Sequence, residues 1–164
     1  MSTSAHDLSA IFDEHVAEPF VNHVPTMIGG VGADEVADFY GKYSIGHWPD
    51  NTRIIPVCRT IGTDRVIDEM IMSFTHDIPM PTFLPNVAPT DRAVLLPVVV
   101  VMGFETDKVA YERIYWDQAS LLVQVGLLDE TLLPVTGGAQ ARKVLDKDLP
   151  ANTLLKADQP GPPA

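Results

Sequence analysis

The amino-acid sequence predicts an α+β domain in which helices near the N-terminus lie on one face of a curved antiparallel sheet. The first observation is that the spacing of apolar residues changes from about 3.6 to about 2 near Arg53, as expected where helices give way to strands. The second is that turn sequences at 62–64 and 106–108 separate strand-like segments, a pattern typical of consecutive hairpins. At 164 residues, the chain is long enough for one such domain with its own core.

Two helices are predicted before Arg53. Apolar residues at 8–16 recur at helical spacing, and Pro19 is expected to end this first helix. An extended segment at 20–24 and a loop at 25–32 follow it. The second helix is predicted from an apolar face that four residues share: Val36, Phe39, Tyr40 and Tyr43.

Alternating apolar residues predict the strands of the sheet. Residues 53–61 and 65–76 form the first hairpin, and a loop with four prolines follows at 78–91. The segment 93–105 is too rich in β-branched residues for a favoured helix. It is therefore predicted as a long buried strand, with Pro97 at a bulge or an edge.

The C-terminal part is predicted to hold one more strand, at 109–116, and two short helices. The first of these helices ends at Gly126, and the second covers 139–145. We expect residues 1–149 to form a single domain. Residues 150–164 end in Gln-Pro-Gly-Pro-Pro-Ala and are predicted to be a disordered tail.

The composition argues against nucleic acid and anionic membranes as partners. The formal net charge is −11, from 22 acidic and 11 basic residues, whereas both of these partners require a basic surface. The longest apolar run, 93–104, is too short to span a bilayer. Cys58 is the single cysteine, and the N-terminus lacks the pattern of a secretory signal. We therefore expect a cytoplasmic location.

Seven short motifs follow one another in a recognisable order between residues 8 and 128. They are Asn22-His23, Trp48-Pro49-Asp50, Gly62-Thr-Asp64-Arg65-Val66, Phe74-Thr75-His76, Pro89-Thr90-Asp91-Arg92, Asp107-Lys108-Val109, and Asp117 followed by Leu121-Leu122-Val-Gln124-Val-Gly126. In this order they resemble the nuclear-transport-factor-two-like cone fold and, within it, the SnoaL-like (polyketide cyclase) branch. The chain also looks like the cyclase-like domains found beside dienelactone-hydrolase-type enzymes.

The resemblance implies a cone-shaped, bent antiparallel sheet that is covered by N-terminal helices and contains an internal apolar cavity. Members of this branch act on small, largely apolar, often carbonyl-bearing molecules without a cofactor. They are commonly homodimers packed through the open face of the sheet. We therefore expect a small apolar ligand, no cofactor and a homodimer.

Asp117 matches the position at which SnoaL-like cyclases carry their acid/base aspartate. Proton abstraction beside a carbonyl requires a base of raised pKa, and an apolar cavity raises the pKa of a carboxylate by desolvation. The alternative is that Asp117 caps the following helix by accepting from the backbone N–H of Ala119 or Ser120. The two roles do not exclude each other, but an Asp117 turned wholly to the helix amides would contradict the first.

His76 and His23 are the histidines that the resemblance brings forward. His76 matches a histidine that ends a central strand, where it would act with Asp117 as base and electrophile across one ligand. The alternative is a core histidine whose hydrogen bonds are satisfied. His23 is expected at the cavity mouth or, alternatively, in a loop contact. None of the five histidines has metal-ligand spacing, so we expect no metal site.

Arg113 and Tyr115 share the strand face of Asp117 if no bulge intervenes, and would then line the same cavity. Family members often carry a His-Trp pair here, whereas this chain has Glu112-Arg113 followed by Tyr115-Trp116. Arg113 could pair with Asp117 or Glu69, and such a pair would lower the pKa of Asp117. The alternative is that Glu112 and Arg113 form an exposed cross-strand pair.

The leading hypothesis is a cofactor-independent cyclase or isomerase that acts on a small apolar carbonyl compound or lactone. Asp117 and His76 are the candidate catalytic residues. The candidate substrate-binding residues are Tyr115, Arg113, His23, Trp48, Met72 and Glu69. The alternative is a non-catalytic ligand-binding or dimerisation domain that accompanies a hydrolase. A third possibility, water activation as in limonene epoxide hydrolase, would use Asp68 with Arg113 and Asp117.

Overall fold

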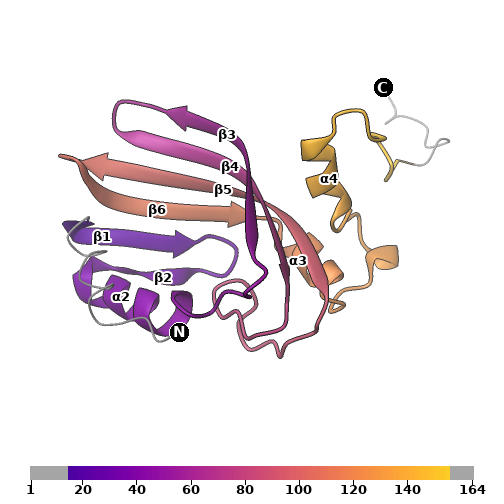
Figure 1. The fold of residues 1–164 in the computed structure, drawn as a ribbon, viewed down its shortest axis with the longest axis horizontal. Helices are drawn as coiled ribbons and strands as arrows, with labels where there is room; N and C mark the ends of the chain where they lie inside the picture. Colours follow the sequence, from indigo (N-terminus) through magenta and orange to yellow (C-terminus); the bar gives the residue numbers. More distant parts are fainter. Residues whose placement is uncertain (1–14, 156–164) are drawn as a thin grey trace, which may run out of the picture.

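A computed structural model describes residues 15–155, which form a six-stranded, bent and unclosed sheet with helices packed against it (Figure 1). The strand order across the sheet is β2-β1-β6-β5-β4-β3. The strands are β1 (His15–His23), β2 (Ile28–Val31), β3 (Arg53–Ile61), β4 (Arg65–Thr75), β5 (Ala93–Glu105) and β6 (Lys108–Trp116). The helices are α2 (Gly32–Phe39), its π-helical continuation Tyr40–Ser44, α3 (Gln118–Gln124), the 3-10 turn Glu130–Leu132 and α4 (Ala139–Leu145). The α+β class is therefore confirmed.

Three consecutive antiparallel pairings, β3 with β4, β4 with β5 and β5 with β6, form the larger part of the sheet. The first turn is closed by a hydrogen bond from the Gly62 N–H to the Arg65 carbonyl, at 2.8 Å. The second turn places Thr106 and Asp107 at φ of 47° and 68°. The predicted bounds of β3 and β5 are confirmed, and β4 ends one residue earlier than predicted.

The N-terminal part of the sheet differs from the prediction in two places. His15 and Val16 belong to strand β1, so the prediction that a helix extends through 16 is wrong; residues 8–14 lie outside the described residues. Strand β2 occupies 28–31, where a loop was predicted. β1 pairs in parallel with β6, which is distant in sequence, so local patterns did not reveal the strand character of His15 and Val16. β2 pairs antiparallel with the end of β1, and its two glycines, Gly29 and Gly30, are residues that rarely indicate a strand.

Two prolines lie within strands, and each occupies a position where the ladder is interrupted. Pro19 is buried in β1 inside the register shift between His15 and Phe20. Pro97 pairs with Ile71 on one side, but on the other side the β5–β6 ladder begins only at Val98. Because proline has no N–H to donate, it is tolerated where one side of the strand lacks a partner.

The core lies between the concave face of the sheet, helix α2 and the loop that joins β4 to β5. Helix α2 buries Val36 and Phe39 there, and Phe83 of the loop packs against the same cluster. Other buried members of the cluster include residues of β1, β4, β5 and α3: Val21, Met72, Phe74, Leu96, Val98 and Leu121. Helices α3 and α4 lie at the opposite end of the molecule from α2 (Figure 1).

Gln124 at the end of α3 continues the pairing of β5 beyond the last residue of β6. Its amide oxygen accepts from the Leu95 N–H at 2.9 Å, and its amide nitrogen donates to the Leu95 carbonyl at 3.1 Å. One side chain therefore satisfies both backbone groups of a strand residue, as a neighbouring strand would. In the described part of the chain, no helix is both long and apolar enough to cross a bilayer.

Candidate functional site

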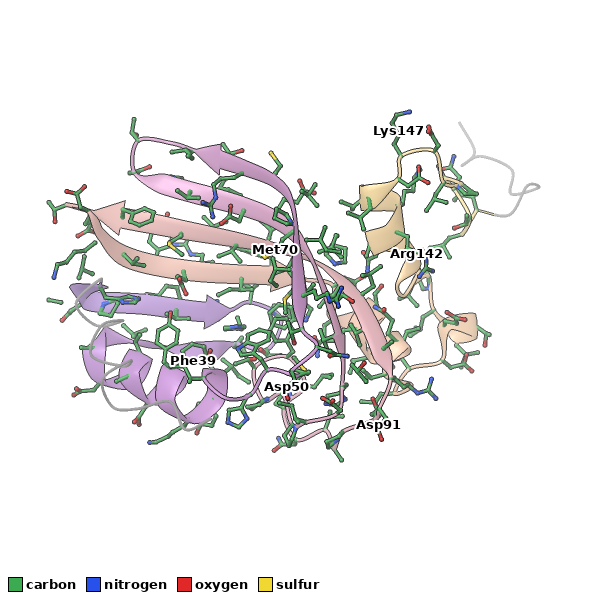
Figure 2. All side chains as sticks on the ribbon, viewed as in Figure 1. Phe39, Asp50, Met70, Asp91, Arg142 and Lys147 are labelled. Carbon is green, nitrogen blue, oxygen red and sulfur yellow. The ribbon has the colours of Figure 1, made fainter. Side chains whose placement is uncertain are left out.

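A cavity of about 380 Å³ lies between the concave face of the sheet and the helical segment 32–44. Figure 2 labels two of its lining residues, Phe39 on α2 and Met70 on β4. Most of the wall is apolar: Phe39, Trp48, Ile54, Met70, Met72, Phe83, Val98, Val100 and Ile114. Its polar side chains are His23, Tyr40, Ser44, Thr52 and Glu112. The internal apolar cavity expected from the sequence is therefore present.

Strand alternation explains which side chains reach the cavity. Successive residues of a strand point to opposite faces, so Met70 and Met72 of β4 share one face and Glu112 and Ile114 of β6 share it too. The intervening Arg113 therefore points to the outer face of the sheet. The same rule places Tyr115 outside, and its side chain is 40% exposed.

Tyr40 and Glu112 form a hydrogen-bonded pair inside the cavity. The Tyr40 hydroxyl donates to Glu112 Oε2 at 2.9 Å. Burial, followed by the negative charge of Glu112, raises the pKa of Tyr40 far above its ordinary value. Tyr40 therefore keeps its proton at neutral pH and remains the donor of this bond.

His23 is enclosed by aromatic rings at the inner end of β1 and is only 6% exposed. Its ring centroid lies 5.3 Å from that of Phe39, 5.7 Å from Phe83 and 5.8 Å from Trp116. Burial lowers the pKa of His23 to about 4, although a hydrogen bond with the Ile28 backbone favours the charged form and acts to raise it. The ring is therefore neutral at pH 7. Among the described residues, its Nδ1 has no hydrogen-bond partner.

Thr52 contributes a second polar atom that is buried without a partner in the described part of the chain, its Oγ1. Since Thr52 also lines the cavity, its hydroxyl can donate to or accept from a bound molecule. A buried polar atom without a partner is costly, and a ligand that supplies the missing hydrogen bond gains affinity.

Asp117 is the N-cap of α3 and is not among the residues that line this cavity. Its carboxylate accepts from the Ser120 N–H at 3.2 Å, the Ser120 hydroxyl at 2.7 Å and the Gln140 amide of α4 at 3.0 Å. Burial acts to raise the pKa of Asp117, but the hydrogen bonds from Ser120 and Gln140 outweigh it and lower the pKa. The expected rise in this pKa is therefore wrong, because hydrogen-bond donors surround the carboxylate where an apolar wall was expected.

His76 is fully buried where β4 leads into the loop, and it too is absent from the cavity wall. Its Nδ1 lies 3.1 Å from the Thr90 hydroxyl, and its backbone accepts from the N–H groups of Thr90 and Asp91. Burial lowers the pKa of His76, although the negative charges of Asp77 and Asp91 act to raise it. The side chain and backbone of His76 thus tie the two ends of the loop together.

The remaining charged candidates lie outside the cavity. The Arg113 guanidinium lies 4.3 Å from the centre of the Tyr111 ring, and within residues 15–155 it forms no ion pair with Asp117 or Glu69. Asp68 is held by Arg59, whose guanidinium donates twice, at 2.6 and 2.7 Å. Arg113, Asp117 and Asp68 therefore do not form the three-residue set that water activation would require.

Of the residues predicted from the sequence, His23, Trp48 and Met72 line the cavity together. The sequence analysis did not select Tyr40 or Glu112 as site residues. Two sequence patterns could have identified them. Tyr40 lies on the apolar face of its helix, and Glu112 alternates with Ile114 and the half-buried Trp116 on one face of β6. In the described part of the chain, no group of three His, Cys, Asp or Glu side chains is arranged to hold a metal ion.

Comparisons with known proteins were made with both the sequence and the structure. No family model and no curated protein matches the sequence. A protein of Jannaschia sp. CCS1 that was named for its likeness to SnoaL-like polyketide cyclases matches the structure with a TM-score of 0.58, at 13% identity, over 74% of this chain and 80% of the other. A nuclear-transport-factor-two-like protein of unknown function from Burkholderia pseudomallei K96243 matches with a TM-score of 0.52, at 19% identity, over 74% and 86%.

These likenesses decide the fold. The chain has the nuclear-transport-factor-two-like fold. A third similar structure is a hypothetical protein of Catenulispora acidiphila DSM 44928 with a ketosteroid isomerase-like fold, solved in complex with trimethylamine. It has a TM-score of 0.51 and 16% identity, over 77% of this chain and 86% of the other. Structures of the nuclear-transport-factor-two-like fold thus include SnoaL-like cyclases and a protein with a small bound ligand.

Proposed function

We propose that the chain binds a small, largely apolar molecule in the cavity between helix α2 and the sheet, and that it moves a proton on that molecule without a cofactor. The observation that carries this proposal is the cavity itself, about 380 Å³ with an apolar wall and a few polar groups. Such a composition is typical of sites for small molecules, where a few polar groups set the orientation. The SnoaL-like and ketosteroid isomerase-like structures of the same fold are in keeping with this type of activity.

The proposal gives the sequence candidates different roles. His23, Trp48 and Met72 contact the ligand, since all three line the cavity. Asp117 stabilises the start of α3 and its contact with α4. His76 stabilises the loop that closes the core.

A binding assay with cavity-filling variants tests this function. Quenching of the fluorescence of Trp48 and Trp116 is followed during titration with 2-tetralone, coumarin and a saturated lactone of similar size. Val100→Phe places a large ring in the cavity and should abolish binding. Val144→Phe, on an exposed position of α4, is the matched control and should bind as the wild type does. Equal affinity of the two variants would show that the ligand binds elsewhere.

The second candidate function is a non-catalytic dimerisation domain, and the outer face of the sheet is the observation that favours it. Half-buried Val99 and Val101 of β5 form an apolar strip there. Glu69 on β4 and Arg113 on β6 flank the strip on opposite sides. A twofold axis along the strip brings Glu69 of one copy toward Arg113 of a second copy, because an isologous interface pairs one surface with itself.

Charge reversal tests this dimer by sedimentation analysis. Arg113→Glu should dissociate it through like-charge repulsion with Glu69, and the double variant Arg113→Glu/Glu69→Arg should restore it. Lys147→Glu, on an exposed loop, is the control and should leave the dimer intact. A wild-type protein that stays monomeric at high concentration would exclude this interface.

A further inference from the structure

We propose that Glu112, positioned by Tyr40, is the catalytic base of this site and removes a proton from a carbon next to a carbonyl group of the bound molecule. The inference rests on the proposed function, because it requires a ligand in the cavity. It adds to that function the residue that performs the chemistry and the side chain that positions it. Tyr40 is a positioning residue, because it acts on the ligand only through Glu112.

The hydrogen bonding of Glu112 leaves one of its oxygens available. Oε2 accepts from the Tyr40 hydroxyl at 2.9 Å, whereas Oε1 has no hydrogen bond within residues 15–155. The bond to Tyr40 restricts rotation of the carboxylate, so the free oxygen keeps its orientation. A general base requires such a free oxygen within reach of the proton that it removes.

The surroundings of Glu112 are apolar. Its cross-strand neighbours are Val21 on β1 and Met102 on β5, and Ile114 follows it on the same face of β6. Glu112 forms no ion pair in the described part of the chain. A ligand that fills the cavity displaces water from the carboxylate, which strengthens its electrostatic attraction to the proton being removed.

The reaction requires no oxidant, reductant or second substrate. A C–H bond beside the ligand carbonyl breaks, an O–H bond forms on Glu112 Oε1, and the electron pair moves to the carbonyl oxygen as an enolate. Return of the proton from Glu112 to the same or a conjugated carbon breaks the O–H bond and restores the carbonyl. The Thr52 hydroxyl, which is buried without a partner among the described residues, is the donor that can stabilise the enolate oxygen.

Asp117 is the competing carboxylate, and its hydrogen bonds argue against it. Oδ1 accepts from the Ser120 N–H, and Oδ2 accepts from both the Ser120 hydroxyl and the Gln140 amide. Both oxygens of Asp117 are therefore occupied, whereas Glu112 keeps one free within residues 15–155, and Asp117 is not part of the cavity wall. A single experiment on both carboxylates therefore decides between them.

Hydrogen–deuterium exchange on 2-tetralone in D₂O, followed by proton NMR at C1, provides the test. We expect the wild type to accelerate exchange above the buffer rate, and Glu112→Gln to lose ~100-fold or more of that acceleration. Glu112→Asp, which keeps a carboxylate, should retain part of it. Asp117→Asn keeps a capping oxygen at its position and should exchange at the wild-type rate. Affinity for 2-tetralone, measured by tryptophan fluorescence, should stay unchanged in all three variants.

Tyr40→Phe separates positioning from a merely structural role. It removes only the hydroxyl, so we expect the exchange rate to fall while the affinity for 2-tetralone is retained. Wild-type binding without exchange, or exchange that survives Glu112→Gln, overturns the assignment while leaving ligand binding intact. Loss of exchange in Asp117→Asn with unchanged affinity also overturns it. If 2-tetralone does not bind the wild type, the inference and its assumed ligand site fail together.

Discussion

Two carboxylates of the same polypeptide segment, Glu112 on β6 and Asp117 at the start of α3, lie in contrasting regions of the molecule. Glu112 is half-buried in an apolar cavity, with one oxygen bound to Tyr40 and the other without a hydrogen bond within residues 15–155. Asp117 is exposed, and both of its oxygens are occupied by donors from α3 and α4. A carboxylate whose two oxygens both accept hydrogen bonds within the fold has no oxygen left to take a proton from a ligand. A carboxylate with one free oxygen in a cavity can still do so.

The molecule thus has a cavity side, formed by the residues that line the cavity between α2 and the sheet. It also has a junction side, formed by α3 and the residues that contact it from β5 and α4. Residues of the cavity side should control both stability and ligand binding. Residues of the junction around α3 should control stability alone. Four predictions, ordered by expected size, test this separation.

Truncation of Phe39, which belongs both to the core and to the cavity wall, should have the largest effect. Phe39→Ala should lower the free energy of unfolding by about 4 kcal/mol, because it removes a buried ring and leaves a void. Urea denaturation measures the loss, and titration with 2-tetralone should show weakened binding. Tyr43→Ala, at an exposed position of the same helical segment, is the control. A smaller loss for Phe39 than for Tyr43 would contradict the assigned packing.

His23 should make stability depend on pH. Because its pKa falls to about 4 in the folded protein, the unfolded state binds more protons between pH 6.5 and 4. The free energy of unfolding should therefore decrease by about 3 kcal/mol as the pH is lowered through this window. Urea denaturation at a series of pH values measures the slope, which should become shallower in His23→Phe. Parallel profiles for the two proteins would show that His23 is not buried in its neutral form.

Gln124 belongs to the junction side, and its loss should leave the Leu95 N–H and carbonyl without their side-chain partners. Gln124→Ala should cost about 2 kcal/mol of stability, while the affinity for 2-tetralone stays unchanged. Gln140→Ala, which removes a single hydrogen bond to Asp117, is the milder control. Thermal unfolding of the two variants measures the difference. A large fall in ligand affinity for Gln124→Ala would show that a residue of the junction side also controls ligand binding, which contradicts the separation.

Asp117 itself should have the smallest effect. Asp117→Ala should cost about 1 kcal/mol through loss of the helix cap, and Asp117→Asn should cost less. The pKa of Asp117 is lowered in the folded protein, so its stabilising effect is present above the ordinary pKa of the group and is lost as the pH falls through the folded value. The stability gap between wild type and Asp117→Ala should therefore close in acid. A gap that widens in acid would contradict the hydrogen bonding described for this carboxylate.

Local patterns accounted for most of the elements after Arg53. The β-branched run at 93–105 and the turns at 62–64 and 106–108 specify neighbouring antiparallel strands, and hairpin pairing needs only nearby residues. The same patterns could not reveal β2 or the strand character of His15 and Val16. The strand character of His15 and Val16 depends on the parallel pairing of β1 with β6, which forms only when distant parts of the chain meet. β2 pairs with β1 in a local hairpin, but its two glycines are depleted in strands and hid it from the pattern.

The sequence predicted only part of the candidate site, because the face of the sheet to which each side chain points depends on strand register. His23, Trp48 and Met72 were selected from the sequence and line the cavity, whereas Glu112 was interpreted as half of an exposed pair with Arg113. The two residues are adjacent on a strand and point to opposite faces, so no lateral pair of that kind forms between them. Local sequence favoured a helix cap at Asp117, and the family resemblance brought the base to the same level. The donors that occupy Asp117 come from Ser120 nearby and from Gln140 on α4.

By itself, the sequence determined the α+β class, the hairpins after Arg53, the acidic net charge of −11 and the helix that follows Asp117. These properties depend on composition or on residues a few positions apart. Only the tertiary structure decided that Tyr40 meets Glu112, because the two residues lie 72 positions apart and are joined through the packing of a helix onto a sheet. It also decided which carboxylate lies in the cavity, since strand register determines the face to which each side chain points.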